Sequence, residues 1–108
     1  MLIYLSIIDS EEEKDKFEKI YEKYKKLMFY IANQILQDEQ LSEDAVHNAF
    51  LKIIDNLDKI IEINSPRTKG FIVIIVKRIS INIYNKRKRE EISDINDERD
   101  RKSTRLNS

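Results

Sequence analysis

The chain has 108 residues, of which 20 are Lys or Arg, 20 are Asp or Glu and none is cysteine. This length supports one modest hydrophobic core, and the lack of cysteine excludes disulfide and thiol chemistry. No apolar run approaches the ~20 residues that span a bilayer. The apolar start MLIYLSII lacks the basic leader and cleavage site of a signal peptide. These features predict one cytoplasmic domain without a membrane span.

The zero net charge conceals a strong separation of charge along the chain. Residues 1–65 carry 8 Lys/Arg against 14 Asp/Glu, residues 66–90 carry 8 against 1, and residues 91–108 carry 4 against 5. The first segment is therefore acidic and the second is strongly basic, with a net charge of +7. We predict two surfaces with different partners, of which the basic one is a candidate binder of a phosphate backbone.

Long helices are expected, because the chain has one glycine and one proline. Residues 2–8 form an apolar lead-in that suits either a short helix or an extended piece. Ser10 followed by Glu11–Glu13 has the form of a capping box, which opens a helix that ends near Leu36. Its core face is predicted from apolar residues at helical spacing: Phe17, Tyr21, Tyr24, Met28, Ile31 and Ile35.

A second helix is predicted after a short connection at residues 38–40. Ser42 is its expected N-cap, because two acidic residues follow in the first turn. Its buried face recurs at steps of three and four through Val46, Phe50, Ile53, Leu57 and Ile60. A polar strip beside that face suits either an interface or exposure to solvent, and it comprises Asp44, His47, Asn48, Leu51 and Asp55.

A third helix is predicted after a loop at residues 59–65, where Ser65 can act as N-cap and Pro66 fits the first helical position. The six apolar residues 71–76 would also suit a strand on propensity alone. The helix is preferred because no partner strand is evident and a buried face recurs through Ile72, Val76, Ile79 and Ile83. Two apolar residues off that face predict contact with another surface: Ile74 and Ile81.

The end of the chain differs in composition from what precedes it. Residues 91–99 are acidic and polar, and we expect them to begin a linker or tail. Residues 100–108, DRKSTRLNS, resemble the translation of a sequencing-adapter oligonucleotide and are predicted to be foreign to the natural chain.

Residues suited to catalysis or metal binding are scarce. His47 is the single histidine, and the sequence contains no cysteine, no glycine-rich phosphate loop and no HExxH spacing. The carboxylates lie in mixed-charge stretches typical of solvated helix surface. We therefore predict no enzyme, no metal site and no cofactor.

Two ordered segments within residues 14–90 resemble region two of the sigma-70 family, specifically its small extracytoplasmic-function type. LSEDAVHNAFLKIIDNLDKI is similar to the family's helix that binds core polymerase; Asp44 and Phe50 match its acid and aromatic, and His47 stands where Gln is usual. FIVIIVKRISINIYNKRKRE is similar to its promoter-recognition helix. There the departures from the usual residues are Phe71 for Trp, Lys77 for Arg, Arg78 for Asn and Asn82 for Asp.

The resemblance implies an all-α fold, a compact three-helix bundle with a short N-terminal element over residues 1–90. It implies a bacterial sigma factor that binds the β′ clamp helices of core RNA polymerase and recognises and melts the minus-ten promoter element. An anti-sigma protein is a further candidate partner. The family's second promoter-binding domain would follow a linker after Glu90, and these 108 residues are expected to lack it.

Two sets of site residues follow from the resemblance and the charge pattern. Polymerase contacts are predicted for Asp44, His47, Asn48, Leu51 and Asp55. DNA contacts are predicted for Lys69, Phe71, Lys77, Arg78, Asn82, Tyr84, Asn85, Lys86, Arg87 and Arg89, with packing against the bundle as the alternative role of Tyr84. The alternative function is a helical protein-interaction module or small regulator without DNA binding, and the +7 segment argues against it.

Overall fold

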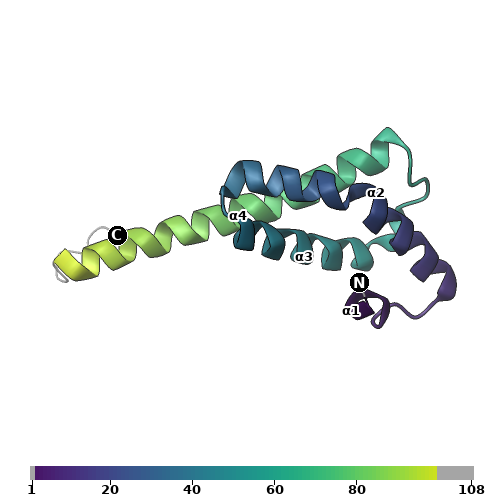
Figure 1. The fold of residues 1–108 in the computed structure, drawn as a ribbon, viewed down its shortest axis with the longest axis horizontal. Coiled ribbons are helices and arrows are strands. Elements are labelled where there is room, and N and C mark those ends of the chain that lie inside the picture. Colours follow the sequence, from purple (N-terminus) through teal and green to yellow (C-terminus); the bar gives the residue numbers. More distant parts are fainter. Residues whose placement is uncertain (1, 100–108) are drawn as a thin grey trace.

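The computed structural model describes residues 2–99, which form helices α1 (Leu2–Leu5), α2 (Glu11–Leu36), α3 (Glu39–Asp55) and α4 (Pro66–Arg99), with a 3₁₀ turn, η1 (Leu57–Lys59), after α3. Helices α2, α3 and α4 each pack against the other two, and α4 projects well beyond them (Figure 1). No strand occurs within residues 2–99, so the predicted all-α fold is confirmed. The adapter-like segment 100–108 lies outside the described residues.

Helix α2 begins where the sequence predicts and ends one residue before a left-handed cap. The Ser10 hydroxyl accepts a hydrogen bond from the Glu13 N–H at 3.1 Å. Gln37 closes the helix with a φ of 50°, and its N–H donates to the carbonyl of Asn33 at 2.8 Å. This cap turns the chain sharply, so that only residues 37–38 separate α2 from α3.

The buried face of α2 is broader than its predicted seam. Phe17, Tyr24 and Met28 are buried as expected, but Tyr21, Ile31 and Ile35 are only partly buried. The reason is that α2 contacts both α3 and α4, so its core face lies between two partners. The residues that the sequence prediction missed on this face are Ile20, Ala32 and Leu36.

The predicted start of the second helix was wrong. Helix α3 begins at Glu39, and Asp38 is its N-cap, with Oδ1 accepting from the Leu41 N–H at 2.9 Å. Ser42 lies inside the helix and is fully buried. Its hydroxyl donates to the Asp38 carbonyl at 2.7 Å and contacts Asn33 Oδ1 at 3.2 Å. Asp38 and Ser42 are both favourable N-cap residues, and the tight turn after α2 places Asp38 at the cap position.

The far end of α3 also differs from the sequence prediction. The helix ends at Asp55, and the seam that was expected to continue through Ile60 passes into η1. Leu57 and Ile60 are nevertheless buried, because the 3₁₀ turn keeps them on the core side.

Helix α4 confirms the helical alternative for residues 71–76 and the predicted cap. The Thr68 N–H donates to Ser65 Oγ at 3.1 Å, and Pro66 occupies the first helical position. The helix runs on through Arg99, so residues 91–99 are helical and not an irregular tail. At 1.5 Å per residue α4 is about 51 Å long. A linker role for residues 91–99 stays a prediction.

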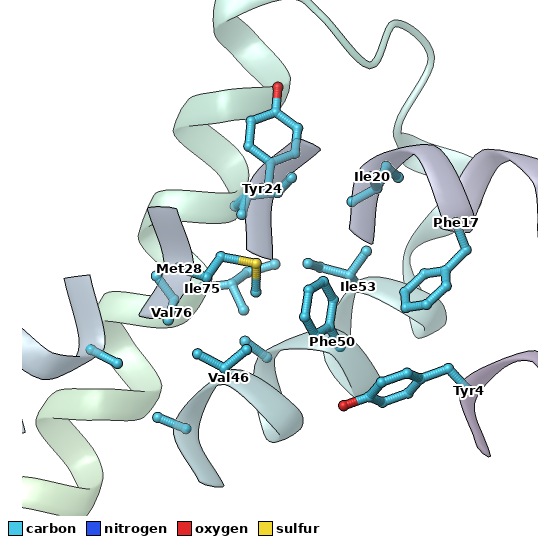
Figure 2. Close-up of a cluster of buried hydrophobic side chains, with 14 of the residues drawn as sticks. Tyr4, Phe17, Ile20, Tyr24, Met28, Val46, Phe50, Ile53, Ile75 and Val76 are labelled. Atoms are coloured by element: carbon cyan, nitrogen blue, oxygen red, sulfur yellow. The ribbon is translucent and has the colours of Figure 1, made fainter. Parts of the chain in front are cut away.

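The core brings all four helices together around a group of aromatic rings. Figure 2 shows Tyr4, Phe17 and Phe50 gathered at one end, and their ring centroids lie 5.4–5.6 Å apart. Met28 of α2 and Val76 of α4 are fully buried at the other end. Each such side chain contributes about 1.5–3 kcal/mol by leaving water. This packing fixes α4 against the bundle and leaves its outer side free.

Ser80 of α4 gives a stability prediction. It is fully buried, and its hydroxyl has no hydrogen-bond partner within the described residues. An unpaired buried hydroxyl costs about 1–3 kcal/mol, so Ser80→Ala should raise the free energy of unfolding by about 1 kcal/mol, measured by urea denaturation. The matched variant Ser42→Ala should lower it, because Ser42 has two partners. A Ser80→Ala protein that is less stable than the wild type would contradict the assignment.

Candidate nucleic-acid interface

One outward stripe of α4 combines cations, amides and an aromatic ring. Its members are three or four positions apart, so they share a single helix face. All are exposed except Phe71, which is half-buried. The stripe extends over most of the length of α4 and consists of Arg67, Phe71, Ile74, Arg78, Asn82, Asn85 and Arg89. We call it the outer stripe.

The remaining predicted DNA residues lie on other sides of α4. Lys69 and Lys77 are exposed but fall outside the outer stripe. Tyr84 is 42% exposed and therefore is not a core residue, and the Lys88 ammonium lies 5.9 Å from the centre of its ring. The structure thus places only part of the predicted set on the outer stripe.

A groove opens where the loop after η1 meets the first turns of α4. Phe71 and Ile74 provide its apolar wall, and Lys59 and Arg67 add two cations. Its volume is about 700 Å³, within the usual range for sites that hold small organic groups. The other lining residues are Ile60, Ile61, Glu62, Ser65, Pro66, Thr68 and Gly70. We call this the loop groove, and the outer stripe begins in it.

Arg87 is not a free cation in this structure. Its Nη1 lies 3.8 Å from Asp38 Oδ2, and its Nε lies 3.5 Å from Glu91 Oε2. Asp38 is also the N-cap of α3, so one carboxylate joins the start of α3 to the basic part of α4. Both ion pairs compete with any phosphate that Arg87 would bind.

Asp38→Asn tests this competition. Asparagine caps a helix as well as aspartate does, so α3 should keep its start while the charge beside Arg87 is lost. We expect the affinity for single-stranded DNA to rise about two- to fivefold at low salt, as measured by fluorescence anisotropy. Glu39→Gln, the same change at the neighbouring exposed position, should have a smaller effect. Equal effects of the two variants would show that Asp38 does not restrain Arg87.

The predicted polymerase residues lie together on α3. Asp44, His47, Asn48 and Asp55 are exposed, and Leu51 is half-buried. His47 is also contacted by α1, since the Tyr4 hydroxyl lies 2.8 Å from its Nδ1. Burial raises the pKa of Tyr4, with the nearby Tyr21 adding to the effect, and this keeps the Tyr4 hydroxyl protonated.

The two predicted sets meet at a second groove between α3 and α4. Polymerase candidates from α3 line one side of it, and Lys86, Arg87 and Glu90 of α4 line the other. The surfaces that the sequence assigns to different partners are therefore adjacent along this edge. The residues from α3 are Leu41, Asp44, His47 and Asn48.

Two residues of the candidate site do not follow from the sequence pattern that predicted the others. Arg67 and Lys59 were not predicted as site residues, although both line the loop groove. Arg67 could have been found from its spacing, because it lies four positions before Phe71. Lys59 joins the groove only through the fold. Among residues 2–92, whose side chains the structure describes, no three His, Asp or Glu side chains are grouped to hold a metal.

Residues 1–65 carry a net charge of −6, whereas residues 66–90, which form most of α4, carry +7, and this separation of charge favours binding of α4 to a phosphate backbone. The sequence model for the family described as Sigma-70 region 2 matches residues 20–90, which is more than half of the chain. The chain therefore belongs to the Sigma-70 region 2 family, a domain of the factors that initiate transcription. None of the curated proteins and none of the solved structures matches it. No helix among residues 2–99 is long and apolar enough to cross a membrane.

Proposed function

We propose that this chain is the region-two domain of a cytoplasmic sigma factor of extracytoplasmic-function type. It binds the β′ clamp helices of core RNA polymerase through α3, and it holds the opened minus-ten promoter element along α4. An anti-sigma protein would compete for the same surfaces. The observation that carries the proposal is the continuity of the outer stripe with the loop groove.

The outer stripe suits a single strand of DNA. Arg78 and Arg89 are exposed cations that can pair with phosphates, and Asn82 and Asn85 present amides that can bond to base edges. Phe71 forms the wall of a groove that is large enough for an unstacked base. A phosphate path that leads into an aromatic-walled groove is the arrangement by which proteins bind single-stranded nucleic acid.

The α3 strip supports the polymerase half of the proposal. Exposed carboxylates at Asp44 and Asp55 flank the exposed amide of Asn48 and the half-buried Leu51. A rim of charge around an apolar contact is typical of protein interfaces. Because α3 and α4 are packed together, a polymerase bound on α3 would hold the DNA stripe at a fixed position.

Phe71→Ala tests the DNA half. Stacking of a base on an aromatic ring is worth about 1–3 kcal/mol, so the variant should bind a single strand of about ten nucleotides roughly 5- to 140-fold more weakly. Fluorescence anisotropy at low salt measures the loss. Phe29→Ala removes another half-buried ring, from α2, and should leave the affinity unchanged.

The same binding assay also tests the alternative function, a protein-interaction module without DNA binding. A wild-type chain that is folded by circular dichroism and yet binds no single-stranded DNA, alone or with core polymerase, would favour the protein-interaction module. Equal losses for Phe71→Ala and Phe29→Ala would remove the loop groove from the proposal.

A further inference from the structure

The loop between η1 and α4 is tied to α2 by the ammonium group of Lys16. Lys16 Nζ donates to the carbonyl of Leu57 at 2.9 Å and to the carbonyl of Ile60 at 2.8 Å. Lys16 is half-buried, and its ammonium bonds to one carbonyl within η1 and to one just after it. These two carbonyls belong to the segment where α3 has ended, and a charged donor gives them stronger hydrogen bonds than a neutral one would.

A second side chain of α2 holds the loop three residues further on. The Tyr24 hydroxyl donates to the carbonyl of Ile63 at 2.6 Å. Its ring is buried in the core, and Figure 2 shows the hydroxyl pointing out of the core cluster. Burial raises the pKa of Tyr24, so the hydroxyl keeps the proton that it donates.

Helix α4 fixes the loop from the other side. Thr68 Oγ1 donates to the carbonyl of Glu62 at 2.5 Å, and Ser65 Oγ lies 3.2 Å from the same oxygen. Ile60, Ile61 and Glu62 of the loop line the loop groove, together with Ser65. Ile61 is 88% exposed, so packing of its own side chain does not hold it there. The position of Ile61 is therefore set by the hydrogen bonds to the carbonyls of its two neighbours, Ile60 and Glu62.

We propose that Lys16 and Tyr24 are positioning residues for the loop groove, which hold residues 57–63 in the conformation that accepts an unstacked base. This inference rests on the proposed function. If the loop is already ordered before binding, the ligand does not have to order it. The conformational entropy lost on binding is then smaller, and the affinity is higher. Neither side chain lines the groove, so each acts through the loop.

The test compares a DNA strand that has bases with one that has none. The probes are an oligodeoxyadenylate of about ten nucleotides, a length that one single-strand-binding domain covers, and an abasic strand of the same backbone. The ratio of their dissociation constants measures what the bases contribute. The full chain is used at low salt, and thermal denaturation verifies that each variant is folded.

For the wild type we expect a ratio of roughly 5 to 140. Tyr24→Phe keeps the buried ring and loses only the bond to Ile63, and Lys16→Met keeps the aliphatic stem. Both should reduce the ratio at least about threefold while the affinity for the abasic strand stays within about twofold. Lys16→Arg, which retains donors, should restore the ratio. Tyr30→Phe removes an exposed hydroxyl elsewhere on α2 and is the matched control.

Hydrogen exchange separates the two ways in which the proposal can fail. The amides of residues 60–63 should exchange faster in Lys16→Met and Tyr24→Phe than in the wild type, whether or not DNA binds. Unchanged exchange, or an unchanged ratio in folded variants, would overturn the positioning role. A wild-type ratio of one would instead refute base binding in the groove, which is the proposed function, and would overturn the inference with it.

Discussion

Reversing Arg78 and Arg89 to glutamate should weaken the binding of single-stranded DNA by about 100-fold at low salt. Both arginines are exposed on the outer stripe. Each reversal removes a phosphate contact and places a like charge beside the backbone, and juxtaposed like charges across an interface cost several kcal/mol. The double change leaves the core face of α4 intact, so the free energy of unfolding should be close to that of the wild type.

The salt dependence of binding gives a second readout of the same variant. A lost phosphate contact lowers the slope of log K against log salt by about 0.7 for a single strand, so the double variant should lose about 1.4. Lys19→Glu with Lys23→Glu makes the same change of charge on the exposed side of α2. Similar losses of affinity in both double variants would show that net charge, and not the outer stripe, determines DNA binding.

Asp44→Arg should abolish most of the affinity for core RNA polymerase, with a loss of about 100-fold. Asp44 is exposed on α3, at the N-terminal end of the proposed polymerase face. The arginine would face the partner group with which the carboxylate pairs, and this juxtaposition of like charges costs several kcal/mol. Glu22→Arg makes the same change on exposed α2 and should bind nearly as the wild type does. A comparable loss in Glu22→Arg would mean that α3 is not the docking face.

Helical periodicity predicted the existence and order of the three long helices, but not all of their ends. Ser42 and Asp38 are both capping residues, and the sequence offers no means to choose between them. The choice depends on the left-handed turn at Gln37, which brings Ser42 against Asn33 and buries it. Boundaries set by tertiary contacts of this kind are not encoded in local propensity.

The extension of α4 past Glu90 also depends on tertiary packing. Residues 91–99 have few apolar side chains, and this composition suggested a tail. A helix that is already formed and fixed by its packing can continue at little cost, because nucleation is the expensive step. The ion pair between Arg87 and Glu91, one turn apart, adds support at the point where the bundle ends.

The candidate site was predictable in composition but not in arrangement. The run of cations after Lys77 pointed to α4 correctly as the basic element. Sequence alone could not show that Asp38 holds Arg87, since 49 positions separate the two residues. It also could not show the loop groove, because its wall is made by a loop and a helix that meet only in the folded chain.

A titration of the labelled, folded chain with core RNA polymerase tests whether this domain acts in transcription initiation. We expect saturable binding at one site per polymerase, weakened strongly by Asp44→Arg and little by Glu22→Arg. We also expect the bound chain to protect the opened strand of promoter DNA along α4. If the folded chain does not bind core polymerase, the polymerase-binding role is wrong, and the shared fold serves a different function.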